Sequence, residues 1–507
     1  MSSEVEQTAQ RKANLEAITG LGCSAYPNKF DTTHTVTELV GAYTDTAAEQ
    51  LENPRVDTIA AGRVVGIRSF GKASFLVISD GRSRLQVYVR QDVLSERDYQ
   101  LSKFLDVGDH IGVSGHLFRT KTNELSIWAG RLEFLAKCFL PLPEKWHGLQ
   151  DVEIRYRQRY LDLIVNPDVR RVFEIRTRAV SAIRDFLTAS GFLEVETPMM
   201  QPIAGGALAR PFVTHHNTLD MKLYLRIAPE LYLKRLTVGG IERVFEINRN
   251  FRNEGISTQH NPEFTMLEFY WAYVDYQRLM TFTEELLSTV AQQVIGTTAF
   301  PFGEHQVNLS APFRRLSLRH AAAEKASEKL GETVTVDDLR HVDSARQVAK
   351  RLGVDAPTGA GAGKIASNIF EALWERDLIQ PTFVHDFPTE VSPLSKQRPD
   401  DPDTVERFEL YIGGFEVANA FSELNDPYEQ QRRFEAQLTD RAAGDQEAHA
   451  MDEDYVRALE YGMPPAGGEG IGIDRLVMLL SNSSSIRDVI LFPLMRPRAE
   501  EQPKTDG

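Results

Sequence analysis

The sequence predicts an α+β protein in which a small five-stranded β-barrel precedes a larger domain built on an antiparallel β-sheet flanked by helices. Three observations support this fold class. Residues 59–137 contain five short runs of β-forming residues separated by turn signals. After residue 149, helical patterns are mixed with strands joined as hairpins, which argues against an array of parallel β-α-β units. A length of 507 residues also requires more than one core.

The first segment, residues 1–58, is predicted to be a helical arm. The stretch "EQTAQRKANLEAITGLG" reads as a helix that ends at glycines, and "TVTELVGAY" reads as a second, shorter helix. The N-terminus is polar and acidic, unlike a signal or transit peptide, and no run of about 18 apolar residues offers a membrane span. We therefore expect a cytoplasmic protein.

The five predicted strands of residues 59–139 are "AGRVVGIRSF", "ASFLVISDG", "RLQVYVRQ", "DHIGVSGHLFRT" and "ELSIWAGRLEFLA", and they indicate an OB-fold. Residues 59–137 hold 12 Lys and Arg against 8 Asp and Glu, so they carry about +4 whereas the rest of the chain carries about −19. Aromatic residues lie among these basic ones, namely Phe70, Phe75, Tyr88 and Phe118. This combination favours a nucleic-acid-binding face, with scattered surface charge and a purely structural role for the aromatic rings as the alternatives.

The remainder of the chain divides by composition. Residues 140–150 read as a linker, residues 151–496 as the second domain with a mainly helical insertion at about 321–380, and residues 497–507 as a disordered tail. The only cysteines, Cys23 and Cys138, form no CxxC pair. A disulfide framework and a Cys-rich zinc site are therefore excluded, and a metal ion would have to be held by oxygen ligands.

The first unusual hairpin is "NRNFRNEGISTQHNPEFTMLEFYW", residues 248–271, because charged residues lie inside both predicted strands. Alternation with a period of two places Asn250, Arg252 and Glu254 on one face of the first strand. It places the following residues on one face of the second strand: Phe264, Met266, Glu268 and Tyr270. Since unpaired buried charges are costly, these groups must pair, bind a ligand or face water, and the aromatic residues argue against a solvated face.

A second acidic hairpin is predicted at residues 406–425 with its turn at Gly413 and Gly414. Glu409 and Glu416 flank this turn, and a further set shares one alternating face: Asn419, Phe421 and Glu423. Two carboxylates without neighbouring Cys or clustered His suit Mg²⁺, which takes oxygen ligands and bridges to substrate phosphates. Glu416 and Asn419 differ in parity, so both can face one site only if a bulge or bend separates them.

The third segment, residues 464–493, is a Gly-rich strand that runs into an apolar helix with Arg475 at the junction. An arginine at a helix start can hold phosphate, although Gly-rich turns before helices are common. The stretch "TGAGAGKI", residues 358–365, is not a P-loop, because Thr358 and Ile365 stand where that motif requires Gly and Ser or Thr.

Together these segments resemble the three motifs of class II aminoacyl-tRNA synthetases: "GFLEVETPMM" with Pro198, "FRNEG" with "HNPEF", and "GIGIDRL". The finer resemblance is to the bacterial type of lysyl-tRNA synthetase, through "GGALARPFVTHHNTLDMKLYLRIAPELYLKRL", "GGFEVANAFSELNDP" and "SIRDVILFPLMRP". It covers about residues 25–495. The resemblance implies an OB-fold anticodon-binding domain at 59–139, a class II catalytic domain at 151–496, and a homodimer formed through the first motif.

The resemblance also implies roles for individual residues. Arg252 and Arg475 are the expected catalytic residues. The expected ATP site comprises Arg252, Glu254, His260, Phe264, Glu409 and Arg475, with Mg²⁺ on Glu409 and Glu416. The expected lysine site comprises Gly206, Glu230, Arg252, Glu268, Tyr270, Asn419, Phe421 and Glu423. The expected anticodon contacts are Arg68, Phe75 and Gln86, and the partner is the tRNA that accepts lysine.

Physical chemistry agrees with these roles. A substrate carboxylate that attacks the α-phosphorus of ATP is already ionised, so the reaction needs positioning and charge neutralisation rather than a strong base. We expect Glu423 to select the lysine side chain, and the acids and arginine of the 248–271 hairpin to be unpaired until substrate arrives. No editing activity is predicted. The alternatives are an aspartyl- or asparaginyl-type synthetase, a ligase that lysylates a protein, and a catalytically silent RNA-binding paralogue.

Overall fold

The computed structural model describes residues 4–143, 149–207, 209–442 and 451–497. These residues form two compact units, Met1–Arg170 and Arg171–Gly507, each described by itself below. The predicted linker lies partly outside the described residues, and the predicted tail lies outside them apart from Pro497. The boundary near residue 150 stays a prediction, because residues 151–170 group with the first unit by their contacts.

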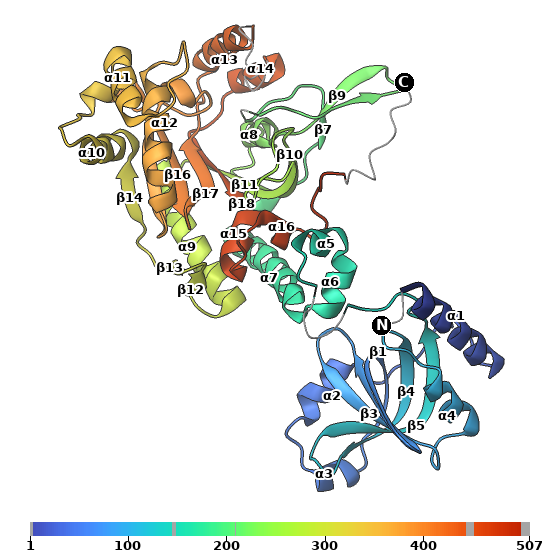
Figure 1. Cartoon of the computed structure of the whole chain (residues 1–507). Helices are drawn as coiled ribbons and strands as arrows, with labels where there is room; N and C mark the ends of the chain where they lie inside the picture. Colours follow the sequence, from blue (N-terminus) through green and yellow to red (C-terminus); the bar gives the residue numbers. More distant parts are fainter. Residues whose placement is uncertain (1–3, 144–148, 208, 443–450, 498–507) are drawn as a thin grey trace. The chain divides into compact units, whose positions relative to one another are not determined.

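The first unit is a closed barrel with the strand order β1-β2-β3-β5-β4 (Figure 1), as the sequence predicts. Its strands are β1 (Asp57–Phe70), β2 (Ala73–Ser79), β3 (Arg84–Arg90), β4 (His110–Arg119) and β5 (Leu125–Ala136). Its helices are α1 (Glu4–Gly20), α2 (Val36–Tyr43), α3 (Ala48–Glu52), α4 (Glu96–Lys103), α5 (Val152–Arg157) and α6 (Arg159–Val165). Strict alternation fixes the inner face: Leu76 and Ile78 are fully buried, whereas Phe75 and Val77 are only partly buried.

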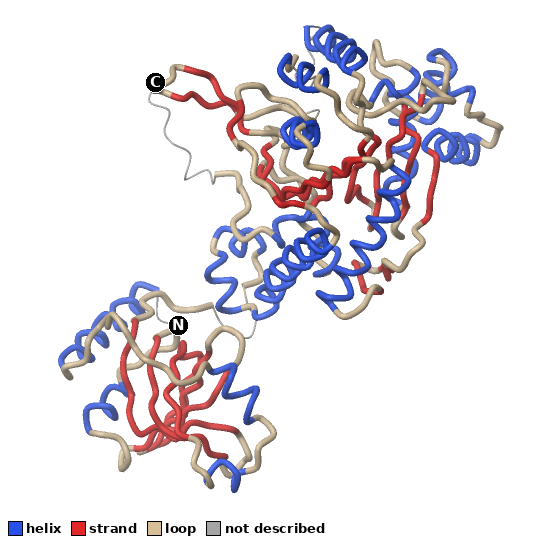
Figure 2. The backbone as a smooth tube through the Cα atoms, turned by 180° about the vertical axis from the view of Figure 1, so that it is seen from behind, coloured by secondary structure: helices blue, strands red, loops and turns tan. Residues whose placement is uncertain are grey.

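The second unit contains an eight-stranded sheet with the order β14-β15-β16-β17-β18-β11-β10-β6. Its strands, drawn in red in Figure 2, are β6 (Leu193–Glu194), β10 (Arg243–Phe251), β11 (Glu263–Ala272), β14 (Arg314–Ser317), β15 (Thr382–Pro388), β16 (Thr404–Ile412), β17 (Phe415–Ser422) and β18 (Ala466–Gly472). The sheet is antiparallel except for its two outermost pairs, β14 with β15 and β10 with β6, which are parallel. The α+β fold class is confirmed, with a mixed rather than purely antiparallel sheet.

Smaller elements complete this unit. A three-stranded sheet contains β7 (Met200–Gln201), β8 (Val213–His216) and β9 (Met221–Leu225), and a hairpin contains β12 (Ala299–Phe302) and β13 (His305–Asn308). The predicted helical insertion contains α10 (Leu318–Leu330), η1 (Asp337–Leu339), α11 (Val342–Leu352), α12 (Ala362–Trp374) and η2 (Glu375–Asp377). Four further elements of this unit are α13 (Pro427–Ala442), α14 (Glu453–Glu460), α16 (Ile486–Val489) and η3 (Thr389–Val391).

Helices cover the two faces of the eight-stranded sheet differently. On one face, α7 (Pro167–Ala189), α9 (Tyr276–Ile295) and α15 (Ile473–Ser481) form the largest apolar core with sheet residues such as Phe269, Phe408 and Ile471. On the other face, α8 (Glu230–Val238) packs on β10 and β11, while α10 and α12 pack near β15 and β16. This second face therefore has a helix group at each side, and its central strands carry the polar residues described below.

The side chain of Glu469, an ionisable residue, points into the apolar core. Glu469 of β18 is 2% exposed, and the hydroxyl of Thr283 in α9 lies 2.8 and 2.7 Å from its two carboxyl oxygens. Burial raises the pKa of Glu469 to about 8, and the bond from Thr283 opposes this only partly. Glu469 is therefore protonated at neutral pH and pairs with Thr283 as a neutral acid.

We predict that Glu469→Gln removes a pH dependence of stability. Between the ordinary pKa of 4.5 and the folded value of about 8, the folded chain holds a proton that the unfolded chain releases, so stability falls as pH rises through this range. Glutamine keeps the polar contact and cannot ionise. Thermal unfolding should show the variant gaining on the wild type from pH 5 to pH 8, whereas the exposed control Glu263→Gln should not. A constant difference in melting temperature would contradict this account.

Candidate active site

The β10–β11 hairpin forms part of the site, but its strands are shorter than predicted. Pairing ends where Phe251 lies opposite Glu263, so Arg252 and Glu254 lie in the connecting loop rather than on a strand face. The amide of Arg252 still donates to the carbonyl of Pro262 (2.9 Å), but Pro262 has no N–H with which to return the bond, so the strand pairing ends there. Asn250 and Phe264 do pair across the hairpin, as alternation requires.

The β16–β17 hairpin contains the irregularity that the sequence demanded. Ala418 pairs with Leu410 while Glu416 pairs with Tyr411, so Val417 is an extra residue in β17. Gly413 and Gly414 form the turn with φ of 68° and 82°, a conformation that favours glycine. Both Glu416 and Asn419 consequently line the same cavity.

The third segment places a Gly-rich strand in the middle of the sheet. β18 lies between β17 and β11, and Arg475 stands in the first turn of α15, as predicted. Gly468 and Gly470 lie on the face of β18 that is turned toward the site, because the side chain of Glu469 between them lies in the core on the opposite face. A Cβ atom at Gly468 would lie 2.0 Å from Oε1 of Glu423, so glycine there makes room for that carboxylate.

A cavity of about 380 Å³ opens on the polar face of the sheet. The predicted site residues that line it are Gly206, Glu230, Arg252, Glu254, His260, Phe264, Glu409, Glu416, Asn419, Phe421 and Arg475. Three predicted lysine-binding residues, Glu268, Tyr270 and Glu423, are not in the lining and are 5%, 3% and 1% exposed. The cavity thus includes the residues expected to bind ATP, and the residues expected around the lysine side chain are buried beside it.

The expectation that the acids of the 248–271 hairpin are unpaired is wrong for Glu263, which lies 3.4 Å from Arg249. Acids of the site outside this hairpin are paired as well. Glu409 bonds to Arg407 (2.6 Å) and to the hydroxyl of Tyr411 (2.6 Å), and Glu416 lies 3.4 Å from Arg475. Glu230 lies 2.6 Å from the ammonium of Lys234, which also contacts Glu423. Charges this deeply buried require partners, and the protein supplies them itself.

The expectation does hold for the arginine. Nε of Arg252 is buried and has no hydrogen-bond partner among the described residues, and the guanidinium lies 5.1 Å from the ring centre of Phe264. Its nearest opposing charges act at longer range, from residues such as Glu416 and Glu254. Arg252 is therefore a half-buried cation that lines the cavity without a hydrogen bond from its Nε to any described residue.

Burial and like charges raise the pKa of several acids at the closed end. The pKa of Glu268 is well above its ordinary value because of burial and the neighbouring Glu230, and the hydroxyl of Tyr270 lies 3.5 Å from it. Burial also raises the pKa of Glu230 and Glu423, and Lys234 opposes both shifts. These three acids outnumber the nearby cations Lys234 and Arg252, and their raised pKa values mean that ionising all of them is unfavourable unless a ligand brings positive charge.

Sequence reasoning missed Arg407, Lys234 and the buried pair of Arg226 with Glu246 (2.7 Å). Arg407 donates to Asn419 (3.0 Å), Ser392 (2.9 Å) and the carbonyl of Val391 (3.0 Å) as well as to Glu409. A basic residue two positions before Glu409, on the same strand face, was the available signal for Arg407. Lys234 stands four residues after Glu230, the helical spacing that allows their ion pair.

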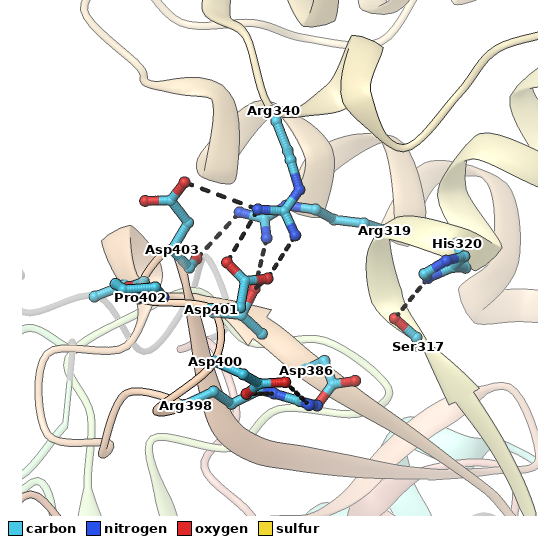
Figure 3. A network of polar contacts seen from close by, with 12 residues as sticks. Ser317, Arg319, His320, Arg340, Asp386, Arg398, Asp400, Asp401, Pro402 and Asp403 are labelled. Atoms are coloured by element: carbon cyan, nitrogen blue, oxygen red, sulfur yellow. Dashed lines mark hydrogen bonds and ion pairs between the residues drawn. The ribbon is translucent and has the colours of Figure 1, made fainter.

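Residues 391–395 form one wall of the cavity. The residues that follow, 398–403, are held by ion pairs to the helical insertion and to β15 (Figure 3). Arg340 pairs with Asp401 through two bonds (3.0 and 2.5 Å) and keeps the pKa of Asp401 well below its usual range. Arg398 pairs with Asp386 (3.1 Å) and Asp400 (2.8 Å). The wall is therefore fixed from outside by charges that do not enter the cavity.

The residues present fit a magnesium ion. Glu409 and Glu416 line one cavity; burial raises the pKa of Glu409, and the neighbouring Glu416 raises it further. Described residues form no cluster of three or more His, Cys, Asp or Glu side chains suited to a metal. Two carboxylates without further protein ligands match Mg²⁺, which takes one or two carboxylates and completes its shell with water and substrate phosphates.

Comparisons with known proteins agree with this geometry. Residues 151–496 match the family of class II tRNA synthetases (D, K and N), and residues 58–135 match the OB-fold nucleic acid binding domain. The lysine–tRNA ligase of Carboxydothermus hydrogenoformans is 56% identical over 488 residues, 96% of this chain and 97% of that protein. That of Bacillus subtilis is 50% identical over 493 residues, 97% of this chain and 98% of that protein. The chain belongs to the class II lysyl-tRNA synthetases.

A further relative is the heat-inducible lysine–tRNA ligase of Escherichia coli K12, which is 51% identical over 495 residues, 97% of each chain. Identity of this extent covers both the barrel and the catalytic unit of the synthetase. It also favours neither the aspartyl- and asparaginyl-type synthetases nor a silent paralogue.

The barrel of this synthetase gathers its predicted anticodon residues on one outer face. Arg68 lies opposite Phe75, and Phe75 lies opposite Tyr88, two residues from Gln86. A row of rings continues from Phe75 across the barrel: Tyr88 is stacked at 4.8 Å, Trp128 follows at 5.2 Å and His116 at 6.1 Å. These aromatic residues therefore do not form the barrel core, and the sequence had not singled out Trp128 or His116.

We predict that Arg407→Ala lowers kcat/KM of lysine-dependent ATP–pyrophosphate exchange by about 100-fold, because removing one partner of a buried ion pair costs about 3 kcal/mol or more. Asn419, Glu409 and the wall at Val391 would lose a shared anchor. Arg351→Ala, which breaks a half-exposed ion pair with Glu332 in the helical insertion, is the control and should change the rate only slightly. A folded Arg407→Ala variant with normal exchange would show that this anchor is dispensable.

Proposed function

We propose that this protein is a lysine–tRNA ligase that activates L-lysine with ATP, forming lysyl-adenylate and pyrophosphate, and then transfers lysine to the 3′-terminal adenosine of its tRNA. The observation that carries the proposal is the closed, negatively charged end of a cavity that also holds the unpaired Arg252. The relatives named lysine–tRNA ligase support it over nearly the full chain.

In the proposed lysine site, each charged group of the substrate lies beside a residue of opposite charge. The α-amino group would meet Glu230 and the carbonyl of Gly206, the carboxylate would meet Arg252 and Asn419, and the side chain would extend along Phe421. The ε-ammonium would meet Glu423 and Tyr270, with Glu268 behind them. Support comes from the burial of this acid cluster, which disfavours a neutral side chain because a desolvated carboxylate would be left without its partner.

The proposed ATP site uses the open part of the cavity. Arg252 would hold the α-phosphate and the substrate carboxylate together, while Phe264 and Arg475 would enclose the adenine. Glu254 and His260 would contact the nucleotide; Nε2 of His260 already lies 3.2 Å from Arg475. Adenylate formation then depends on alignment and on neutralising phosphate charge, since the attacking carboxylate is already ionised.

Glu409 and Glu416 would hold Mg²⁺ as the cofactor. When bound, the ion would supply positive charge to the phosphates of ATP. Arg407 and Tyr411 orient Glu409, and Arg475 lies beside Glu416, so the chain fixes both carboxylates without it.

The proposed tRNA contact is the outer face of the barrel with Arg68, Phe75 and Gln86. We also propose a homodimer through the first motif. Apolar residues exposed around β6 and β7 support this, namely Leu193 (53%), Met199 (48%) and Met200 (56%), since an exposed apolar patch indicates an interface. No helix among the described residues is long and apolar enough to cross a bilayer. A cytoplasmic location is proposed from the activity.

Two other functions are less well supported. An aspartyl- or asparaginyl-type site would need a cation for its ligand, whereas Glu423 offers an acid and Lys234 is already paired with it. A silent RNA-binding paralogue would have no need of Arg252, Arg475, Glu409 and Glu416 around one cavity.

We predict that Arg475→Ala reduces adenylate formation by orders of magnitude, because it removes a phosphate-binding cation and the support of Glu416, whose carbonyl accepts a 2.6 Å bond from Arg475. The measurement is lysine-dependent ATP–pyrophosphate exchange. Arg184→Ala, which breaks a surface ion pair with Glu194, serves as control. Full activity of Arg475→Ala would remove this residue from the mechanism.

We predict that Phe75→Ala raises KM for tRNA in aminoacylation by roughly tenfold or more, because one base stack contributes about 1–3 kcal/mol. ATP–pyrophosphate exchange, which needs no tRNA, should stay normal. Tyr26→Ala, which removes an exposed ring (55%) in the same unit, should leave both unchanged. An unaltered KM for tRNA in the Phe75→Ala variant would argue against stacking at this position.

A further inference from the structure

Lys234 is a buried cation held between two carboxylates. Its ammonium lies 2.6 Å from Oε1 of Glu230, contacts Oε2 of Glu423, and stands 5.3 Å from the ring centre of Phe421. The side chain of Lys234 is 0% exposed, and that of Glu423 is also 0% exposed. Two acids from different elements, α8 and the end of β17, are therefore joined by one internal ammonium.

These two acids are the ones proposed above for the amino groups of lysine, and Lys234 leaves one of their oxygens open. Oε1 of Glu423 is buried and has no hydrogen-bond partner among the described residues, whereas Oε2 contacts Lys234. Oε1 lies against Gly468, whose missing side chain keeps this place clear. A ligand ammonium can therefore pair with Glu423 while Lys234 stays in place.

The buried charges at this end leave a deficit of one positive charge. Three acids, Glu230, Glu268 and Glu423, face two cations, Lys234 and Arg252, if all five are ionised. Lysine brings two ammonium groups and one carboxylate, so it supplies the missing positive charge, whereas a neutral amino acid does not. Without Lys234 the deficit would be two, and Glu423 would have no adjacent cation, which is strongly unfavourable in a desolvated site.

Several titratable groups act on Glu423, and Lys234 is the dominant favourable one. Burial raises the pKa of Glu423, Lys234 opposes this, and Glu230 adds to it. The other groups facing the cluster are Glu268 and Tyr270 from β11, Tyr455 from α14, and Arg407 from β16 at longer range. The two acids raise the pKa of Lys234 itself although burial alone would lower it.

We propose that Lys234 is a positioning residue for amino-acid selection, holding Glu230 and Glu423 ionised and fixed so that the cavity accepts one additional positive charge. The proposal rests on the lysine-binding roles given under Proposed function. Lys234 acts through the two carboxylates and does not itself contact the substrate.

The test is Lys234→Met in the full-length enzyme, with kcat and KM for lysine measured separately by ATP–pyrophosphate exchange between about pH 6 and pH 9. Without Lys234, Glu423 keeps its proton to higher pH, and an incoming ammonium must displace that proton. We expect KM for lysine to rise about tenfold or more near neutral pH, and its increase toward low pH to begin about one unit higher than in the wild type. kcat should change much less, and Lys234→Arg, which keeps the charge, should restore the wild-type pH profile.

Selectivity gives a second readout. We expect the Lys234→Met variant to lose most of the preference for lysine over the uncharged analogue that carries a methyl group in place of the ε-ammonium. Lys137→Met is a matched control, because Lys137 is also buried (0% side-chain exposure) between two acids, Asp106 and Asp109, but lies in the barrel. It should leave the KM for lysine and its pH profile unchanged.

A Lys234→Met enzyme with the wild-type pH profile and selectivity would overturn the proposal. If that variant does not fold, Glu423→Gln and the charge-balanced Lys234→Met/Glu423→Gln variant carry the test. Removing Lys234 after Glu423 is neutral should change the preference for lysine over the uncharged analogue by less than about threefold, because Lys234 acts on the ε-ammonium through Glu423 whereas its effect through Glu230 is the same for both substrates. A tenfold change in that preference would overturn the proposal. Failure of the wild type to exchange with lysine would instead refute the proposed function, so the two failures are distinguishable.

Discussion

The structure depends on one constraint: ionised groups on the polar face of the eight-stranded sheet lie out of water and must each be neutralised. Glu409 is paired by Arg407, and Glu230 and Glu423 share Lys234. The pair of Lys234 with Glu423 also joins α8 to the residue after β17, and the bond from Arg407 to Asn419 joins β16 to β17. Since buried pairs add little net stability, their consequence is geometric: they fix where a ligand's charges must lie.

Arg252 is the exception that gives the site its chemistry. It lies in the loop beyond β10 with its Nε unpartnered, whereas Glu409, Glu230 and Glu423 already contact a cation of the protein. An enzyme that joins two anionic groups needs a cation free to approach both of them, and little else in the way of proton transfer. The glycines of β18 leave room beside the strand for side chains of the site, as Gly468 does for the carboxylate of Glu423.

The sequence was sufficient for the fold class, the barrel strands and most of the cavity lining, because alternation, turn glycines and motif spacing are local signals. The bulge at Val417 was also required in advance by the parity of Glu416 and Asn419. Pairing between distant segments was not accessible: nothing local to Glu423 shows that Lys234, 189 positions earlier, neutralises it. The end of β10 at Phe251 was missed because alternation alone does not show it, although Pro262, which cannot donate to the ladder opposite Arg252, was a local signal.

The most direct test of the account is ATP–pyrophosphate exchange by the wild-type enzyme with Mg²⁺, measured with each of the twenty standard amino acids in turn. A closed cavity end that lacks one positive charge predicts exchange with lysine and no comparable exchange with any other amino acid. Comparable exchange with a neutral or acidic amino acid, or none with lysine, would contradict it.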